Sequence, residues 1–296
     1  MSSPHHPFSI IEAPSVLGLF PKGVETLPQA LLHAGLAEGL GARHAGRVEP
    51  PPYEHKRDPD TGILNPRGIA AYSVALAGGV SGVLDQGRFP VVLGGDCSIL
   101  LGCLLGLKRR RPPGLLFLDG HADFYQPEKE PNGEVASMEL GFATGRGPAI
   151  VADIEGRGPL VRDEDVVVFG RRDGADAEAH GSQRIEETAI EVIDLAAVRE
   201  AGVGAAAAAR AVARLSPVVG GFWVHLDADV LDDAIMPAVD YRMPGGLSWD
   251  ELAVILRAAV TGGAVGIDVT IFNPRLDGDG SIARAVADVL VKGLKP

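Results

Sequence analysis

The sequence predicts an α/β fold of three layers (α/β/α), in which helices cover both faces of a mainly parallel central sheet. Short apolar runs rich in β-branched residues alternate with longer segments of helical period, which is typical of strands joined by crossover helices. The runs are almost continuously hydrophobic, as expected of strands covered on both faces. Neither an internal repeat nor a second core is evident, so we expect residues 1–296 to form a single domain.

Each element follows from these patterns. Strands are expected at Ser9–Ile11, Val91–Leu93, Leu115–Leu118, Val166–Phe169, Val192–Ile193, Trp223–Leu226 and Val265–Val269. Helices are expected at Leu27–Leu40, Gly68–Leu84, Ile99–Lys108, Ala196–Leu215, Trp249–Val260 and Ile282–Leu294. Ser98, Asp194 and Ser248 precede helical segments closely, where their side chains could cap free N–H groups.

The composition narrows the possible partners. A net charge of −12 argues against a long nucleic-acid footprint, which needs a basic face. The N-terminus lacks a basic segment followed by an apolar one, and no uninterrupted apolar stretch approaches the ~20 residues that span a bilayer, so we expect neither a secretory signal nor a membrane partner. Cys97 and Cys103 are too few for a disulfide framework, and a cytoplasmic location is the expectation.

Potential metal ligands stand directly after three of the predicted strands. Asp119, His121 and Asp123 follow Leu115–Leu118 at alternate positions, so their side chains share one face. Ligands bind at the carboxyl ends of strands in open α/β sheets, so the three strand ends could converge on one site. The other donors at these ends are Asp227 and Asp229 after Trp223–Leu226, and Asp96, Cys97 and Ser98 after Gly94-Gly95.

Clustered carboxylates must repel each other or share cations. Two divalent ions about 3.5–4 Å apart can be bridged by carboxylates and can generate hydroxide from water near neutral pH. Oxygen-rich ligation with one imidazole suits Mn²⁺. The alternative is that these acids only cap helices, but Asp-x-His-x-Asp together with Asp-x-Asp, both ending buried strands, favours a metal site.

These motifs resemble those of the arginase, agmatinase and formiminoglutamase family. Gly94-Gly95-Asp96-Cys97-Ser98 is similar to the family's Gly-Gly-Asp-His-Ser, Asp119-Gly120-His121-Ala122-Asp123 to its Asp-Ala-His-x-Asp, and Asp227-Ala228-Asp229-Val230-Leu231-Asp232 to its Asp-x-Asp-x-x-Asp. Pro244-Gly245-Gly246-Leu247 and Asn273-Pro274 also match. The resemblance runs from about residue 90 to 275 and identifies the chain as a divergent member.

The resemblance implies an arginase-like fold with two Mn²⁺ ions per chain, although other divalent ions would also suit the ligands. Cys97, Asp119, Asp123 and Asp227 would surround one ion, and Asp119, His121, Asp227 and Asp229 the other, with Asp119 and Asp227 as bridges. Asp123 and His121 would be catalytic, with Asp123 orienting the attacking hydroxide toward a planar carbon. A trimer or hexamer is expected by analogy.

The sequence departs from the family pattern at three positions where the family has a metal ligand, a substrate-binding residue or a proton-transferring residue. Cys97 replaces a histidine ligand; a thiolate can bind a softer ion, or the cysteine could be buried and inert. Ile271 stands where arginases keep the glutamate that pairs with the guanidinium, and Asp268 could replace it only in a different register. Ala136 replaces the proton-shuttling histidine, and Glu134 or Glu139 could supply an acid instead, or be merely solvated or helix-capping.

The candidate substrate-binding residues are Asp240, Arg242, Glu139 and Ile271. Arg242 could clamp a carboxylate and Asp240 could receive a cationic or N-hydroxylated group, unless both belong to a surface loop with a local ion pair. Tyr125 replaces an asparagine that reads the amino-acid end of the substrate. His225 is expected to support a ligand or fill the core rather than bind metal itself.

The predicted function is hydrolysis of a non-peptide C–N bond in a small amidine. An N-hydroxylated or modified guanidine, or a formimino compound, is favoured over arginine because of Ile271. One alternative is a catalytically silent homologue that binds a metabolite or stabilises a partner subunit, since Cys97, Ala136 and Ile271 all lie at working positions. Another alternative is a true arginase or agmatinase.

Overall fold

The computed structural model describes residues 7–200 and 204–295 of the chain. Within them lies one parallel sheet of eight strands in the order β2-β1-β3-β8-β7-β4-β5-β6. The strands are β1 (Phe8–Glu12), β2 (Arg43–Arg47), β3 (Phe89–Leu93), β4 (Gly114–Leu118), β5 (Val166–Phe169), β6 (Glu191–Ile193), β7 (Phe222–Asp227) and β8 (Ala264–Thr270).

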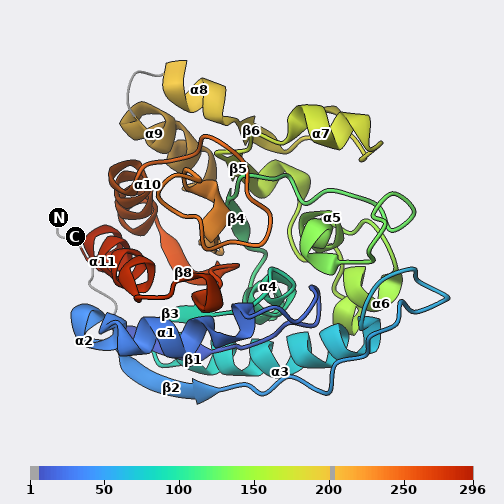
Figure 1. The fold of residues 1–296 in the computed structure, drawn as a ribbon, viewed down its shortest axis with the longest axis horizontal. Coiled ribbons are helices and arrows are strands. Elements are labelled where there is room, and N and C mark those ends of the chain that lie inside the picture. Colours follow the sequence, from blue (N-terminus) through green and yellow to red (C-terminus); the bar gives the residue numbers. More distant parts are fainter. Residues whose placement is uncertain (1–6, 201–203, 296) are drawn as a thin grey trace.

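Helices cover both faces of this sheet (Figure 1). The core on one face is formed with α3 (Pro66–Asp85), α4 (Ile99–Lys108), α5 (Glu139–Ala143) and α6 (Ala149–Ala152). The core on the other is formed with α1 (Leu27–His33), α2 (Leu36–Leu40), α8 (Leu195–Glu200), α9 (Gly204–Leu215), α10 (Trp249–Thr261) and α11 (Ser281–Leu294). The short helix α7 (Gly174–Ala179) follows β5. The predicted three-layer α/β/α fold is confirmed.

The pleat of the strands explains the two cores. In β4, Leu115 and Phe117 face α3 and α4, whereas Leu116 and Leu118 face the opposite helices. Side chains of a strand alternate between the faces of a sheet, so a central strand must be apolar at every position. The near-continuous hydrophobicity of the sequence therefore reports burial on both faces.

One predicted helix was wrong in part, and one strand was not predicted. The single helix expected over Leu27–Leu40 is two helices, because Gly35 between α1 and α2 has φ 87° and breaks the helical path. Strand β2 was not predicted, because its sequence Arg-His-Ala-Gly-Arg lacks an apolar pattern and lies exposed at the sheet edge. The helix expected over Ala196–Leu215 is described as α8 and α9, and residues 201–203 lie outside the described part.

The helix caps were predicted with mixed success. Ser248 forms a reciprocal capping box with Glu251, and Asp194 accepts a 2.8 Å hydrogen bond from the Ala197 N–H. Ser98 makes no side-chain cap bond to α4; its own N–H instead donates to Asp96 Oδ1 at 2.9 Å. The aspartate thus fixes the turn that precedes α4.

Helix α3 is, by length and composition, the one helix of the described residues that could cross a bilayer. Its buried side chains, among them Ile69, Leu76 and Val80, pack in the core that it shares with α4 and the sheet. A core helix passes the same length and composition test, so α3 alone is weak evidence for a membrane span.

Candidate metal centre and active site

The turn from β3 to α4 brings Cys97 into the sheet's carboxyl edge. A Cβ on Gly95 would lie 1.7 Å from the Ser15 carbonyl oxygen, so this close approach requires glycine. Asp96 secures the turn, with Oδ2 accepting a 2.9 Å hydrogen bond from Ser15 Oγ. Cys97 is fully buried, with Sγ 3.0 Å from Asp227 Oδ2 and 3.3 Å from Thr270 Oγ1. Cys97 therefore faces the carboxylates.

The loop after β4 presents three donors. Asp119 is fully buried and its Oδ1 accepts a 2.6 Å hydrogen bond from the His121 N–H. The imidazole Nδ1 of His121 lies 2.9 Å from Asp229 Oδ2 and 3.6 Å from Asp119 Oδ1. Asp123 is 6% exposed and has φ 43°, a left-handed conformation that is uncommon for residues other than glycine.

The end of β7 completes the arrangement. Asp227 Oδ1 accepts a 2.7 Å hydrogen bond from the Asp229 N–H, and Asp229 Oδ1 accepts one of 3.0 Å from the Gly120 N–H. The loops after β4 and β7 are thereby tied together, as the adjacency of these two strands allows. Both aspartates are buried.

The donors form overlapping groups whose ligand atoms lie within 4.8 Å of one another. One, here called the His121 group, contains Asp119, His121 and Asp229, and another contains Asp119, Asp123 and Glu139. His225 joins Asp119 and Asp227 in a third group. A fourth, here called the Cys–Glu–His group, contains Cys97, Glu139 and His225. All six predicted donors thus converge, and two further residues join them.

Burial and mutual repulsion shape the electrostatics. Burial, then neighbouring carboxylates, raise the pKa of Asp119, Asp123 and Asp227 well above the ordinary value. Burial would lower the pKa of His121, but Asp229 and Asp119 raise it well above its usual range. Asp229 differs from the other acids: burial acts to raise its pKa, yet His121 holds it below the ordinary value. His121 thus offsets the charge of Asp229, while Asp119, Asp123 and Asp227 repel one another without a cation of their own.

Unpaired buried acceptors test whether divalent ions would fit. Asp119 Oδ2, both carboxylate oxygens of Glu139 and Nε2 of His225 are buried without a hydrogen-bond partner. Buried polar atoms are almost always paired, and each unpaired one costs roughly 1–3 kcal/mol. Cations bound by these atoms would remove that cost and the repulsion together. The residues present fit a binuclear metal centre.

A cavity of about 480 Å³ leads to the cluster, with His121 among its lining residues. Its wall contains Tyr125, Glu134, Asp240 and Arg242. Asp240 Oδ1 accepts a 3.0 Å hydrogen bond from Asn273 Nδ2, while Oδ2 is buried without a partner. Asp240 therefore keeps one oxygen free for a ligand.

The other candidate substrate residues occupy different positions. Arg242 is exposed and forms an ion pair with Asp233 while it lines the cavity. Ile271 is 5% exposed and has φ 68°, and Glu139 is fully buried among the metal donors. Ala136 is also buried and does not line the cavity, whereas Glu134 does, with its Oε2 accepting a 2.5 Å hydrogen bond from Tyr241.

Three residues that support the centre were missed from the sequence. Asp173 Oδ2 accepts a hydrogen bond of 3.2 Å from the Ala122 N–H, and Arg171 Nε donates to Asp173 Oδ1 at 2.6 Å. Arg172 donates to the carbonyl oxygen of Asp229 at 2.7 Å. The available signal was Arg171-Arg172-Asp173 just after β5, the neighbour of β4.

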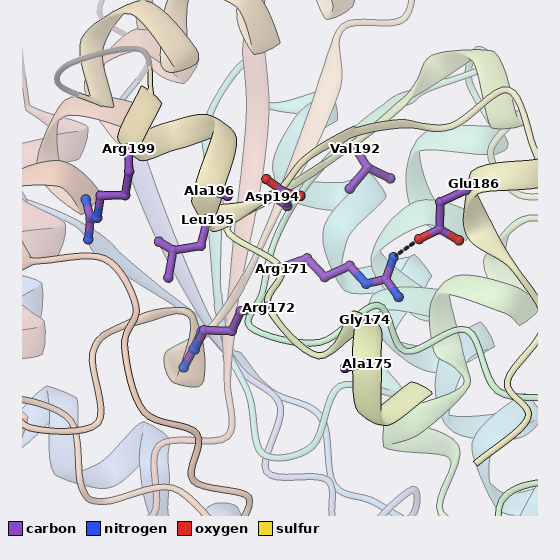
Figure 2. A pocket seen from close by; sticks show the side chains of 10 residues that line it. All are labelled: Arg171, Arg172, Gly174, Ala175, Glu186, Val192, Asp194, Leu195, Ala196 and Arg199. Atoms are coloured by element: carbon purple, nitrogen blue, oxygen red, sulfur yellow. Dashed lines mark hydrogen bonds and ion pairs between the residues drawn. The ribbon is translucent and has the colours of Figure 1, made fainter. Parts of the chain in front are cut away.

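These arginines also line a second cavity of about 750 Å³ beside the centre. Figure 2 shows Arg171 reaching toward Glu186, with which it forms a 2.6 Å ion pair, while Arg172 turns the opposite way. A Cβ on Gly120 would lie 2.4 Å from Arg172 Nη1, so the guanidinium packs directly against the loop that carries His121.

Comparison with known proteins decides the family. A model of the arginase family matches residues 6–294. The chain belongs to the arginase family. An arginase from Bacillus caldovelox is 30% identical over 92% of each chain, and one from Brevibacillus brevis is 30% identical over 95% of each. The crystal structure of Bacillus cereus arginase has a TM-score of 0.85 at 27% identity, covering 97% of both chains.

Family membership agrees with the cluster. Proteins of the arginase family are hydrolases with a binuclear metal centre, and this chain brings its ligand groups together at the family's strand ends. About 30% identity marks it as a divergent member, as the sequence predicted. His225 enters the cluster from β7, one step below Asp227, and Glu139 enters it from α5, a placement that the sequence alone did not indicate.

Proposed function

We propose that this arginase-family chain is a single-domain, binuclear-metal hydrolase that cleaves a non-peptide C–N bond in a small amidine. The supporting observation is the convergence of Cys97, Asp119, His121, Asp123, Asp227 and Asp229 beside one cavity. Asp119 and Asp227 would bridge two ions, with Mn²⁺ suited to the oxygen-rich side. When bound, the pair would supply a water-derived nucleophile near neutral pH.

The residues of the cavity would position the substrate. Asp123 would accept a hydrogen bond from the nucleophile and orient it toward the planar carbon. Asp240, with its free Oδ2, would bind the amidine nitrogens, and Arg242 would contact a substrate carboxylate. Glu134, which lines the cavity and pairs with Tyr241, would deliver a proton to the leaving amine.

The proposed substrate class rests on Ile271. A guanidinium facing two metal ions and an isoleucine would lack the charge-assisted contact that a carboxylate on this strand could offer. A less basic N-hydroxyguanidine or an uncharged formimino group would lose less binding free energy from the absence of this contact. These compounds are therefore proposed ahead of arginine as substrates.

Arginine itself is the second candidate. The relatives that match over nearly the whole chain are named arginases, and Asp240 could receive a cation in place of the missing glutamate. A silent homologue is disfavoured because all the donor positions carry ligand atoms.

The experiment is a substrate screen with metal-reconstituted protein. Arginine, agmatine, their N-hydroxy analogues and formimino amino acids are supplied separately, and urea, hydroxyurea, formamide and ammonia are measured. We expect turnover of a less basic amidine at a higher kcat/KM than arginine. Turnover of none of them by protein that holds two ions would support the silent homologue instead.

A further inference from the structure

The end of β7 holds a buried histidine that the proposed chemistry does not use. His225 is fully buried, and its ring is stacked on Phe117 with centroids 4.7 Å apart. Its Nδ1 lies 2.6 Å from Asp268 Oδ2, and Asp268 also accepts a hydrogen bond from the Trp223 indole. The ring is thus held by Phe117 and by Asp268, which Trp223 orients in turn.

This arrangement selects one tautomer and leaves one nitrogen unused. With the proton on Nδ1 donated to Asp268, Nε2 carries a lone pair, and that atom has no hydrogen-bond partner. Histidines that ligate metals are commonly oriented in this way, by a carboxylate on the other ring nitrogen. A histidine with only a packing role would leave a buried acceptor unsatisfied, at roughly 1–3 kcal/mol.

Glu139 faces the same point from α5. It is fully buried, and no N–H or hydroxyl group donates a hydrogen bond to its carboxylate oxygens, which lie beside another buried acid, Asp123. Its ligand atom, the Nε2 or Nδ1 of His225 and the sulfur of Cys97 lie within 4.8 Å of one another. A buried carboxylate without a partner is costly unless a cation is bound beside it.

We propose that Cys97, Glu139 and His225 together bind a thiophilic divalent ion, of which Zn²⁺ is the representative, on the Cys97 side of the centre. The inference rests on the proposed binuclear function and makes the two ions chemically unequal. Sulfur, imidazole and carboxylate are the ligands that Zn²⁺ takes, whereas Mn²⁺ prefers oxygen. The His121 group has two aspartates and one imidazole, so its ligands suit a cation that prefers oxygen.

The test measures binding of Zn²⁺ and Mn²⁺ to metal-free protein by titration and elemental analysis. Glu139→Gln and His225→Asn should each weaken Zn²⁺ binding at one site and leave the second site occupied. The loss of affinity should exceed the roughly 10–100-fold that is typical when a residue that only orients a metal ligand is removed. Asp229→Asn should weaken the other site instead. His180→Asn, the same change at an exposed histidine of the cavity, should alter neither.

Cobalt supplies a second readout that does not depend on activity. Co²⁺-loaded wild type should show a thiolate-to-cobalt absorption band that Cys97→Ala abolishes and that Glu139→Gln and His225→Asn shift or weaken; Cys103→Ser should retain it. Melting of the metal-free variants checks folding, and Glu139→Gln should leave that melting temperature nearly unchanged, because it keeps the size of a buried side chain whose oxygens have no hydrogen-bond partner.

Two failures are distinguishable. The inference is overturned, and the binuclear proposal stands, if wild type binds two ions and the folded variants Glu139→Gln and His225→Asn also bind two ions with unchanged Zn²⁺ affinity. If wild type binds a single ion, and only Asp229→Asn weakens the binding of that ion, both this inference and the binuclear proposal are overturned. If His225→Asn does not fold, Glu139→Gln and the cobalt band decide.

Discussion

Cys97 touches a carboxylate and a hydroxyl but no solvent, and its role as a metal ligand can be tested at the level of one residue. Cys97→Ala should empty one of two metal sites, because no other side chain would replace the sulfur, whereas Cys97→His should retain both ions with altered metal preference. Metal content by elemental analysis checks this. Cys103→Ser, at the other buried cysteine, is the control. Equal metal content in wild type and Cys97→Ala would refute the assignment.

Ile271 is the residue on which specificity depends. Ile271→Glu should raise the kcat/KM for arginine relative to N-hydroxyarginine by roughly 30-fold or more, because a charge-assisted contact is worth about 2–5 kcal/mol. The variant should fold, since a β-branched side chain at φ 68° is itself strained. Ile271→Gln, of the same size without the charge, should change the ratio little. An unchanged ratio for Ile271→Glu would remove Ile271 from the substrate site.

Single residues also show where sequence reasoning stops. The clustering of the donors after β4 and β7 could be predicted because the carboxyl ends of neighbouring parallel strands meet at one edge of the sheet. Strand alternation does not place them, because Asp119, His121 and Asp123 lie in the loop after β4. Glu139 could not be placed, because it follows a loop of about twenty residues whose path only the packed molecule defines. His225 was correctly placed one step below Asp227, but its unpaired Nε2 depends on Asp268 in the adjacent strand β8.

At the scale of elements, the turn between β3 and α4 is the most constrained part of the site. Gly95→Ala would drive a Cβ into the Ser15 carbonyl, so we expect a loss of roughly 2–4 kcal/mol of stability and of metal at the Cys97 side. Gly78→Ala, on the exposed face of α3 with open space around it, should instead stabilise by roughly 0.5–1 kcal/mol. Denaturant unfolding of both variants gives the comparison; similar stabilities would contradict it.

The elements were predictable where burial sets the pattern. Every central strand was expected, because residues covered on both faces must be apolar. Edge strand β2 was not predicted because its five residues are mostly exposed. It is a strand because it pairs with β1, not because its sequence is hydrophobic. The break at Gly35 was not predicted because the apolar periodicity continues across it from α1 to α2.

At the scale of the whole molecule, the metal centre joins strands from both halves of the sequence. Chelation should therefore destabilise the entire fold: binding at 100 times Kd contributes about 2.7 kcal/mol per site, so two sites lost should lower Tm by roughly 5 °C or more. Because both cores share the sheet, we expect a single transition with and without metal. Scanning calorimetry checks this, and an unchanged Tm after verified metal removal would contradict it.

A binuclear centre requires one chain to bind two divalent ions. Asp119 lies within 4.8 Å of donors in three of the overlapping groups, and Asp227 lies beside both Asp119 and Cys97, an arrangement that fits carboxylates shared by two cations. Elemental analysis of protein reconstituted with excess metal and freed of unbound ions should give two ions per chain. A value of one or less in folded wild-type protein would contradict the binuclear centre.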